Sequence, residues 1–374
     1  MRIAVLNLTG GGMSVGYVRY LTAVLPRLSA SNEISAILCA SPAALNVPEW
    51  ITHSQKIKFV NCEPFRFMRH GPDPGLKTAL DEFRPDIIFI PLERYLSYRN
   101  VPVVSMVRNM APLSGLTVAN GVVEKVKCLA QALEARIATN KAVAIITPTV
   151  YVKEFLMRNW GLLTEKIFVV NYGAPDMGGI SHPPSGLTEF PESFIFPAGS
   201  IEVYRGLEDL VRTMPCLKKD FPGLKLLIAG EARANTQSYL VKLKKLAAEV
   251  GVQREIVWLG YLADEELSWC YNHCSAFVMT SRVESFGFVA LEAMSHGCNC
   301  VSTSSPCMPE IFADAALYYN PEDISGLESA LSVVLSRNIN QRNKFKAMAI
   351  ARAAGFSWEK VASQTLAILK DSMR

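Results

Sequence analysis

The sequence has no apolar run long enough to span a membrane. A membrane-spanning helix needs about 20 predominantly apolar residues, and no stretch of this chain approaches that length. We recognise no secretory signal peptide, because the chain opens directly on the strand-like segment "MRIAVLNL". Charge is also weak: a formal net charge of +4 over 374 residues is too small for a dedicated nucleic-acid-binding protein. We therefore expect a cytoplasmic protein with no nucleic-acid partner.

Motifs that hold metal ions or disulfides are missing as well. The nine cysteines are odd in number and form no disulfide framework, which indicates a reducing compartment. Neither a Cys-x-x-Cys pair nor an Asp-x-Asp motif occurs. One cluster invites a zinc hypothesis: His296, Cys298, Cys300 and Cys307. Its first two cysteines fall in "CNCVST", an expected buried strand. We expect no metal ion and no bound cofactor.

A dinucleotide-binding fingerprint is incomplete. The loop "GGGMSVG" (10–16) follows the first strand and opens the first helix, which is the position of a phosphate-binding turn. It lacks the strict Gly-x-Gly-x-x-Gly spacing, and no acid ends the second strand, "ISAILCA", where a ribose-binding Asp or Glu would stand. These absences disfavour an NAD-dependent oxidoreductase. The loop is then either an anion-binding turn or a tight turn that requires glycine.

The chain does contain a repeated alternation of short apolar strands and helices. With 374 residues and 50% hydrophobic residues, it is long enough for two cores. The alternation predicts parallel sheets covered on both faces. We expect strands at 3–8, 33–40, 86–90, 101–107 and 142–149, then at 193–199, 224–230, 254–260, 275–281 and 299–304.

Composition suggests where the two α/β domains begin and end. Residues 173–192 are rich in Gly, Pro and Ser and predict a linker. The first domain would then be 1–172 and the second 193–355. The tail 356–374 has helical periodicity, with apolar residues available to pack on a neighbour.

The stretch "ESFGFVALEAMSHG" (284–297) combines an acid with the start of an apolar helix. We expect Ser285 to cap this helix, which would begin at Phe286 and end at Gly297. Amides at the helix start would bind an anion, and Gly287 would let the ligand approach the backbone. These amides belong to Phe286, Gly287 and Phe288.

Two acids flank the expected anion site. Glu284 precedes it and Glu292 lies within the helix. A carboxylate there is awkward for phosphate but suits hydroxyl groups, and a sugar nucleotide carries both. The alternative is that both acids are helix-dipole or surface charges. In "PAGSIEVYRGLEDLV" (197–211), Arg205 stands at a helix start, which is unfavourable for a cation unless an anion binds there. Arg205 as a solvated surface charge is the other interpretation.

These residues resemble a known family. From "CSAFVMTSRVESFGFVALEAMSHGC" through "CVSTSSPCMPEIFADAALYYNP", the chain resembles the donor-binding half of retaining glycosyltransferases of family 4. Their signature, a Glu followed after seven residues by another Glu, is matched by Glu284 and Glu292. The segments "LGYLADEELSWCYNHC" and "FSWEKVA" also resemble the family. The resemblance implies the GT-B fold, with two doubly wound Rossmann-like domains, a cleft between them, and a final helix that packs back on the first domain.

The resemblance also implies roles for single residues. Glu284 would contact hydroxyls of the donor sugar and Glu292 those of the nucleotide ribose. Arg205 stands where the family usually has a Lys that neutralises the diphosphate, so Arg205 and Glu284 are the expected catalytic residues, acting at opposite ends of the donor. The other expected donor-binding residues are Gly11, Gly12, Ser200, Ser285, Phe286, Gly287 and Phe288.

Two positions depart from the family. The family usually has an Arg near Ser200, and this chain supplies no cation there. It often has a His after the strand that corresponds to "VPVVSMV", where this chain has Arg108 and Asn109. These two residues are the expected contacts on the acceptor or sugar side.

The sequence thus predicts a retaining, metal-independent glycosyltransferase of glycan or polysaccharide assembly. It would transfer a sugar from a UDP- or GDP-linked donor to a hydroxyl acceptor, either a glycan or a lipid-linked molecule. A catalytically inactive sugar-nucleotide-binding protein is the alternative. The run "FRFMRH" (65–70) interleaves aromatics with cations. It suits either an anionic surface at the inner face of the membrane or an ordinary solvated loop.

Overall fold

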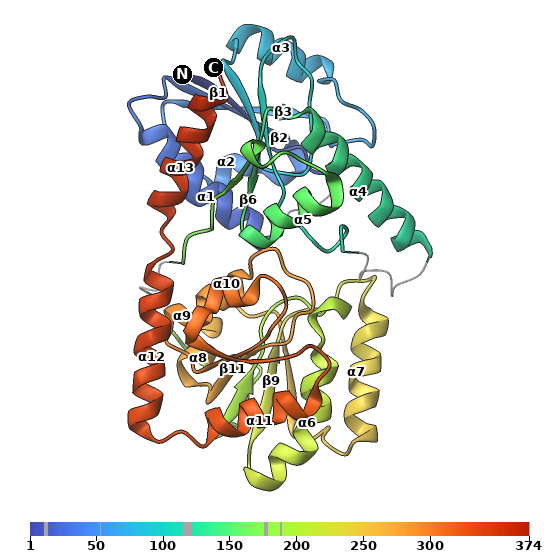
Figure 1. Cartoon of the computed structure of the whole chain (residues 1–374), viewed down its shortest axis with the longest axis vertical. Coiled ribbons are helices and arrows are strands. Elements are labelled where there is room, and N and C mark those ends of the chain that lie inside the picture. Colours follow the sequence, from blue (N-terminus) through green and yellow to red (C-terminus); the bar gives the residue numbers. More distant parts are fainter. Residues whose placement is uncertain (11–13, 53, 115–121, 176–178, 188, 374) are drawn as a thin grey trace. The chain divides into compact units, whose positions relative to one another are not determined.

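The chain forms two compact α/β units (Figure 1). The computed structural model describes residues 1–10, 14–52, 54–114, 122–175, 179–187 and 189–373. One unit comprises Met1–Leu113, Val126–Gly173 and Ser357–Arg374, and the other comprises Ser114–Lys125 and Ala174–Phe356. Each contains a parallel sheet with helices, so the expected class of two Rossmann-like domains is confirmed.

The first unit is built on a sheet with the strand order β3-β2-β1-β4-β5-β6-β7. Its strands are β1 (Arg2–Leu6), β2 (Ala36–Pro42), β3 (Ile57–Cys62), β4 (Ile87–Ile90), β5 (Val103–Met106), β6 (Ala144–Thr147) and β7 (Ile167–Val169). Its helices are α1 (Val15–Ala30), α2 (Val47–Trp50), α3 (Pro74–Phe83), α4 (Val122–Lys141), α5 (Val150–Trp160) and α13 (Trp358–Asp371), with 3-10 turns η1 (Ala43–Leu45) and η3 (Thr164–Lys166). The first four residues of α4 group with the second unit.

The second unit has the strand order β10-β9-β8-β11-β12-β13. Its strands are β8 (Phe194–Phe196), β9 (Lys225–Ala229), β10 (Ile256–Gly260), β11 (Ala276–Met279), β12 (Cys300–Thr303) and β13 (Ala316–Tyr319). Its helices are α6 (Leu207–Asp220), α7 (Gln237–Glu249), α8 (Asp264–His273), α9 (Phe288–Ser295), α10 (Met308–Phe312), α11 (Ile324–Leu335) and α12 (Ile339–Ala354), with 3-10 turns η4 (Val203–Arg205) and η5 (Ala313–Ala315).

Both sheets reverse their direction of growth near the middle. In the first unit β2 and β3 extend from one side of β1, and the chain then returns to the other side at β4. In the second unit β9 and β10 extend from one side of β8, and β11 lies on the other. Doubly wound sheets bind ligands outside the carboxyl ends of their strands at such a switch point. The loops after β8 and β11 are therefore the expected position of a ligand site in the second unit.

The central strands hold these loops on a rigid base. All residues of β4 are fully buried, and those of β8 are at most 1% exposed. Parallel strands covered by helices on both faces are expected to be apolar throughout. The helices α6 and α11 contribute Leu210, Met214 and Leu331 to the core of the second unit.

The final helix belongs to the first unit. The ring of Trp358 lies 6.3 Å from that of Tyr20 on α1 and stacks on Tyr172 at 6.4 Å. At the start of α13, Glu359 accepts a hydrogen bond of 2.8 Å from Arg27. Figure 1 shows α13 beside α1. Aromatic contacts of this kind account for the attachment of a segment that is remote in sequence.

Three strands, β3, β7 and β13, are additional to those expected from the sequence. Residues 174–192, which belong to the expected linker 173–192, group with the second unit. One contact that attaches them is the amide of Ser185, which donates to the carboxylate of Glu266 on α8 at 2.8 Å. Among the helices that the structure describes, none is long and apolar enough to cross a membrane.

Candidate functional site

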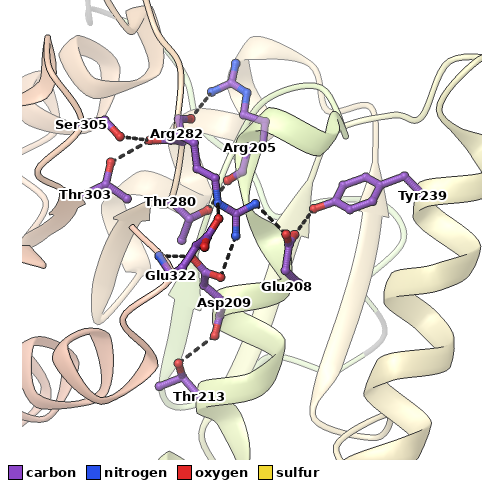
Figure 2. A network of polar contacts seen from close by, with 11 residues as sticks. Arg205, Glu208, Asp209, Thr213, Tyr239, Thr280, Arg282, Thr303, Ser305 and Glu322 are labelled. Carbon is purple, nitrogen blue, oxygen red and sulfur yellow. Dashed lines mark hydrogen bonds and ion pairs between the residues drawn. The ribbon is translucent and has the colours of Figure 1, made fainter. Parts of the chain in front are cut away.

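Two loops meet at the switch point of the second unit. The loop after β8 runs through η4 to α6, and the loop after β11 runs to α9. The hydroxyl of Thr280 donates to the carbonyl of Arg205 at 2.5 Å, and the amide of Arg282 donates to the carbonyl of Tyr204 at 2.8 Å. These two bonds hold η4 against the second loop, and Figure 2 shows the one between Thr280 and Arg205.

Glycine permits this close approach. Gly206 lies between η4 and α6 with a φ of +61°, and a Cβ added there would lie 2.8 Å from the carbonyl oxygen of Thr280. Gly230, after β9, has a φ of +138°, and its Cβ would lie 1.9 Å from the carbonyl oxygen of Gly199. Side chains are excluded at both positions by conformation and by space. The sequence therefore allows the three loops to lie in backbone contact.

Arg205 and Glu284 are brought together in this site. Nη1 of Arg205 lies 2.9 Å from Oε1 of Glu284, and the two side chains are 17% and 13% exposed. The hydroxyl of Ser281 donates to the same carboxylate oxygen at 3.2 Å. Burial by itself would lower the pKa of Arg205. The neighbouring groups, chiefly Glu284 and Tyr204, raise it by more than burial lowers it, so the pKa is above its ordinary value. Arg205 is therefore a partly enclosed, permanently charged group.

Two other expected donor-binding residues lie in the same loops. Ser200 is half-buried in the loop after β8. It follows Gly199, whose added Cβ would lie 3.0 Å from Nη2 of Arg205. Ser285 follows Glu284 and is also half-buried. The guanidinium of Arg205 thus lies over the backbone beside Ser200.

The helix that follows Glu284 begins later than expected. Helix α9 starts at Phe288, and its N-cap is Gly287 with a φ of +89°, so the prediction of a start at Phe286 with Ser285 as the cap is wrong. Phe286 is 1% exposed and packs edge-on against Phe356 at 5.9 Å. The buried ring fixes the chain before it turns at Gly287. Of the three residues expected to present amides at the helix start, only Phe288 lies in the helix.

Glu292 is a buried acid. Its side chain is on α9, the residue is 6% exposed, and its Oε2 accepts a hydrogen bond of 2.8 Å from the hydroxyl of Tyr271. His296 stacks on Tyr271 with ring centroids 5.0 Å apart. A buried carboxylate costs free energy unless it is hydrogen-bonded, so it is not an incidental surface charge. The interpretation of Glu292 as a surface charge is wrong.

Sequence analysis missed Arg282, which organises the adjoining polar network (Figure 2). Its guanidinium pairs with Glu208 at 2.6 Å, with Asp209 at 3.0 Å and with Glu322 at 3.3 Å. Glu208 also accepts a hydrogen bond from the hydroxyl of Tyr239. Burial raises the pKa of Asp209, and Arg282 opposes that rise. The sequence did contain one sign of this network: two adjacent acids, Glu208 and Asp209, in the first turn of α6. A cation remote in sequence could neutralise them.

The structure describes only some of the site residues expected in the first unit. Gly11 and Gly12 lie outside the described residues. Arg108 and Asn109 follow β5, and their amides donate to Oε1 of Glu93 at 2.5 and 2.7 Å. The guanidinium of Arg108 lies over the ring of Tyr17, 4.5 Å from its centroid. Glu93 and Tyr17 therefore fix the turn after β5.

The cysteine cluster does not form a metal site. Cys298, Cys300 and Cys307 are buried, and Cys274 lies 3.8 Å from Cys298, sulfur to sulfur. Within the described ranges, no group of three or more His, Cys, Asp or Glu side chains is arranged to hold a metal ion. These thiols fill the core around β12 instead.

The second unit matches a known protein family. Residues 186–352 match the family described as "Glycosyl transferases group 1". A curated relative is the serotype-specific mannosyltransferase WbdA of Escherichia coli, 27% identical over 199 residues, which are 53% of this chain and 24% of the relative. The chain thus spans about a quarter of the length of this relative.

Solved structures extend the similarity to both units. Sucrose-phosphate synthase from Thermosynechococcus elongatus aligns with a TM-score of 0.74 at 17% identity, over 99% of this chain and 98% of that chain. Anabaena HepE in complex with UDP aligns with a TM-score of 0.72 at 15% identity, over 99% and 100%. HepE has also been solved with UDP-glucose. The chain therefore has the GT-B fold, and its residues 186–352 match the glycosyl transferases group 1 family.

Proposed function

We propose that this protein is a retaining glycosyltransferase of family 4. It transfers a sugar from a nucleoside diphosphate sugar to a hydroxyl acceptor in glycan or polysaccharide assembly. The observation that carries the proposal is the ion pair of Arg205 and Glu284, 2.9 Å apart, at the switch point of a group 1 domain. The mannosyltransferase and the UDP-bound neighbour support a sugar nucleotide as the donor.

Arg205 serves the leaving group in this proposal. Its guanidinium binds the diphosphate and stabilises the charge that develops as the bond between sugar and phosphate breaks. The positive end of α9 adds to this field. Together they supply the positive charge for which other enzymes use a metal ion. The departing diphosphate accepts the proton of the acceptor hydroxyl on the same face of the sugar, so the new bond keeps the configuration of the old one.

The two acids orient the rest of the donor. Glu284 accepts hydrogen bonds from hydroxyls of the sugar, and Glu292 accepts them from the ribose. Tyr271 leaves the Glu292 carboxylate further acceptor capacity, because an ionised carboxylate has about four lone-pair sites. Ser200 and the segment 285–288 complete the proposed donor site of the second unit. Arg108 and Asn109 contact the acceptor or the sugar.

A binding screen followed by a transfer assay tests this function. Thermal unfolding is measured with UDP, GDP, ADP and their sugars, because a ligand at 100 times its Kd adds about 2.7 kcal/mol to stability. We expect one nucleotide series to stabilise the protein and its sugar to be transferred, with activity that survives EDTA. Binding without transfer would support the alternative, an inactive sugar-nucleotide-binding protein. The lack of a cation near Ser200 is the sequence feature that favours this alternative. Activity lost to EDTA and restored by Mg²⁺ or Mn²⁺ would contradict metal independence.

We also propose that the first unit contacts an anionic membrane surface, where a lipid-linked acceptor would lie. Large apolar side chains are exposed at the tip of the 65–70 loop and along one face of α4: Phe67, Met68, Val126, Leu129 and Leu133. The loop is attached to α4 because Glu134 accepts hydrogen bonds from the amide of Met68 and the ring of His70. The same segments carry exposed cations: Arg66, Arg69, Lys127 and Arg136. Arg66 and Arg69 also pair with Glu63, at 3.5 and 2.7 Å. Exposed apolar groups on segments that carry cations suit an anionic bilayer.

A further inference from the structure

The ion pair between Arg205 and Glu284 fills the place where the proposed donor would bind. Nη1 of Arg205 is 2.9 Å from Glu284 and 3.4 Å from the hydroxyl of Ser281. In the part of the chain that the structure describes, Glu284 is the sole carboxylate within ion-pairing distance of Arg205. The binding group for a phosphate is therefore already neutralised by a residue of the site itself.

Three acids of neighbouring elements are paired with another cation. Glu208, Asp209 and Glu322 all pair with Arg282, which keeps them from Arg205. The backbone bond from Thr280 to the Arg205 carbonyl holds the two loops in register. Glu202 is a further acid whose charge raises the pKa of Arg205, but Glu284 is the carboxylate that pairs with the guanidinium, at 2.9 Å.

Arg205 also retains unused donor capacity. Its Nε is buried and has no hydrogen-bond partner among the described residues. A guanidinium carries five N–H groups in a planar fork that matches phosphate oxygens. Because Nε is buried, an incoming phosphate meets Arg205 at its terminal nitrogens, where the charge of the phosphate lies next to the carboxylate of Glu284.

These contacts favour one ligand over another. A free nucleoside diphosphate competes with Glu284 for Nη1 and is repelled by its charge. An intact nucleoside diphosphate sugar meets the same competition, but its sugar hydroxyls donate to the displaced carboxylate and replace the lost cation. We propose that Glu284 is a resident counter-anion of Arg205 that makes the site select the sugar-bearing donor over the free diphosphate. This inference rests on the proposed function and makes Glu284 a specificity-determining residue.

The test is the affinity of the free diphosphate in a variant without the Glu284 charge. Glu284→Gln keeps the shape of the side chain and removes the competing anion. By calorimetry with UDP and GDP, we expect the nucleotide that binds the wild type to bind Glu284→Gln about five- to tenfold more tightly. The corresponding UDP- or GDP-sugar should not gain affinity. Diphosphate affinity that is unchanged or weaker in a variant with wild-type thermal unfolding overturns the inference.

Two further variants isolate the cause. Glu249→Gln also removes one negative charge from the second unit, but Glu249 lies on α7 and pairs with Lys245 at 3.6 Å. It should leave diphosphate affinity unchanged, and an equal gain there would reduce the effect to net charge. In the double variant Arg205→Ala with Glu284→Gln, the gain over Arg205→Ala alone should vanish. A gain that persists without Arg205 contradicts the proposed competition.

The same titrations separate this inference from the proposed function. Wild-type protein that binds no diphosphate and no sugar nucleotide overturns both proposals. Binding and sugar transfer by the wild type, without tighter diphosphate binding in Glu284→Gln, overturns only the role of Glu284 as a counter-anion.

Discussion

At the scale of single residues, the surroundings of Glu292 show how a buried acid is kept in place. Tyr271 donates to its carboxylate at 2.8 Å, and His296 stacks on the Tyr271 ring. Burial of this kind is expected where a carboxylate must stay oriented for a ligand. The proposed ribose contact therefore uses an acceptor whose position is already fixed.

Glu292→Gln should weaken binding of the nucleoside diphosphate by about 1.5 to 3 kcal/mol, because the ribose hydroxyls lose a charged acceptor. Tyr271→Phe, which removes only the hydroxyl that orients Glu292, should weaken it less. Calorimetric titration of both variants measures the difference. Unchanged affinity in a folded Glu292→Gln would remove Glu292 from the donor site.

His296 should make the second unit sensitive to acid. Its Nδ1 lies 2.8 Å from the carbonyl oxygen of Glu292, so Nδ1 donates, and Nε2 accepts from the Ser268 hydroxyl at 2.9 Å. Burial lowers the pKa of His296 from 6.5 to about 4. The folded state thus favours the neutral ring. Its contribution to stability is fully present above pH 6.5 and is lost as the pH falls toward 4.

Urea unfolding at neutral pH and near pH 4.5 measures this loss, for which we expect about 1 to 3 kcal/mol in the wild type. His296→Gln should lose less over the same interval because the titrating group is gone. His273→Gln is a matched control, since His273 is exposed on α8. A pH dependence that is the same in all three proteins would show that His296 does not cause it.

Sequence reasoning found the residues of this site more readily than their contacts. Motif spacing singled out Glu284, Glu292 and Arg205, and the structure brings Glu284 and Arg205 together. The sequence did not indicate that Glu284 and Arg205 would form an ion pair, because they are 79 positions apart (284 minus 205). Arg282 was missed for the same reason, since its partners lie on α6 and after β13. Pairing between distant loops depends on sheet topology, which a single sequence does not specify.

At the scale of elements, Arg282 joins the loop after β11 to the first turn of α6. It pairs with Glu208 and Asp209, two acids that suit the positive end of that helix. Without a cation beside them, the same acids would place negative charge near the proposed diphosphate site. Arg282 is therefore a positioning residue, which acts through Arg205 and the loop that carries Glu284.

Arg282→Ala should lower the free energy of unfolding by about 3 kcal/mol, because it leaves partly buried acids without a partner. Arg282→Lys keeps the charge but cannot bond all three carboxylates at once. We expect Arg282→Lys to fold, to raise the KM for the donor and to change kcat little. Thermal unfolding and steady-state kinetics test this prediction. An unchanged donor KM in both variants would limit Arg282 to a structural role.

The central strands could be predicted from the sequence, whereas three strands at sheet edges could not. β4 and β8 are continuous apolar runs, as expected for strands buried on both faces. β3, β7 and β13 lie at edges of the two sheets, and β3 exposes Lys58 and Asn61. The mixed composition of β3 suits an edge strand, which has one partner. β7 (IFV) and β13 (ALYY) are not mixed, but they contain only three and four residues. The late start of α9 was also not predictable from local sequence. Ser285 is a favourable helix cap, but Phe286 is buried and the helix begins only at Phe288.

At the scale of the whole molecule, the two-domain architecture was predictable because strand–helix alternation occurs twice. The attachment of α13 to the first unit depends on Tyr20, Tyr172 and Trp358, three rings from distant parts of the chain. Periodicity identified the helix, but the resemblance to GT-B proteins was needed to suggest its partner. The first unit also has exposed apolar groups on α4 and the 65–70 loop, and the proposed membrane contact depends on them.

Membrane binding should depend on that surface and on lipid charge. Leu129 and Leu133 are 71% and 48% exposed on one face of α4, so replacing both by Glu removes apolar area and adds repulsion without disturbing the core. We expect the wild type to float with vesicles that contain anionic lipid and to remain in solution with neutral ones. The variant Leu129→Glu with Leu133→Glu should lose at least about tenfold in vesicle affinity, since each cation near an anionic surface adds about 1 kcal/mol and burial of two leucines adds more.

Val241→Glu is the control for this experiment. Val241 is 64% exposed on α7 in the second unit and lies outside the proposed surface, so its replacement should leave flotation unchanged. Equal flotation with neutral and anionic vesicles would contradict the role of the cations. If the wild type does not float but self-associates in a manner that the α4 substitutions abolish, the surface binds a second copy of the chain. The apolar face of α4 would then be a protein interface, and the proposed membrane contact would be wrong.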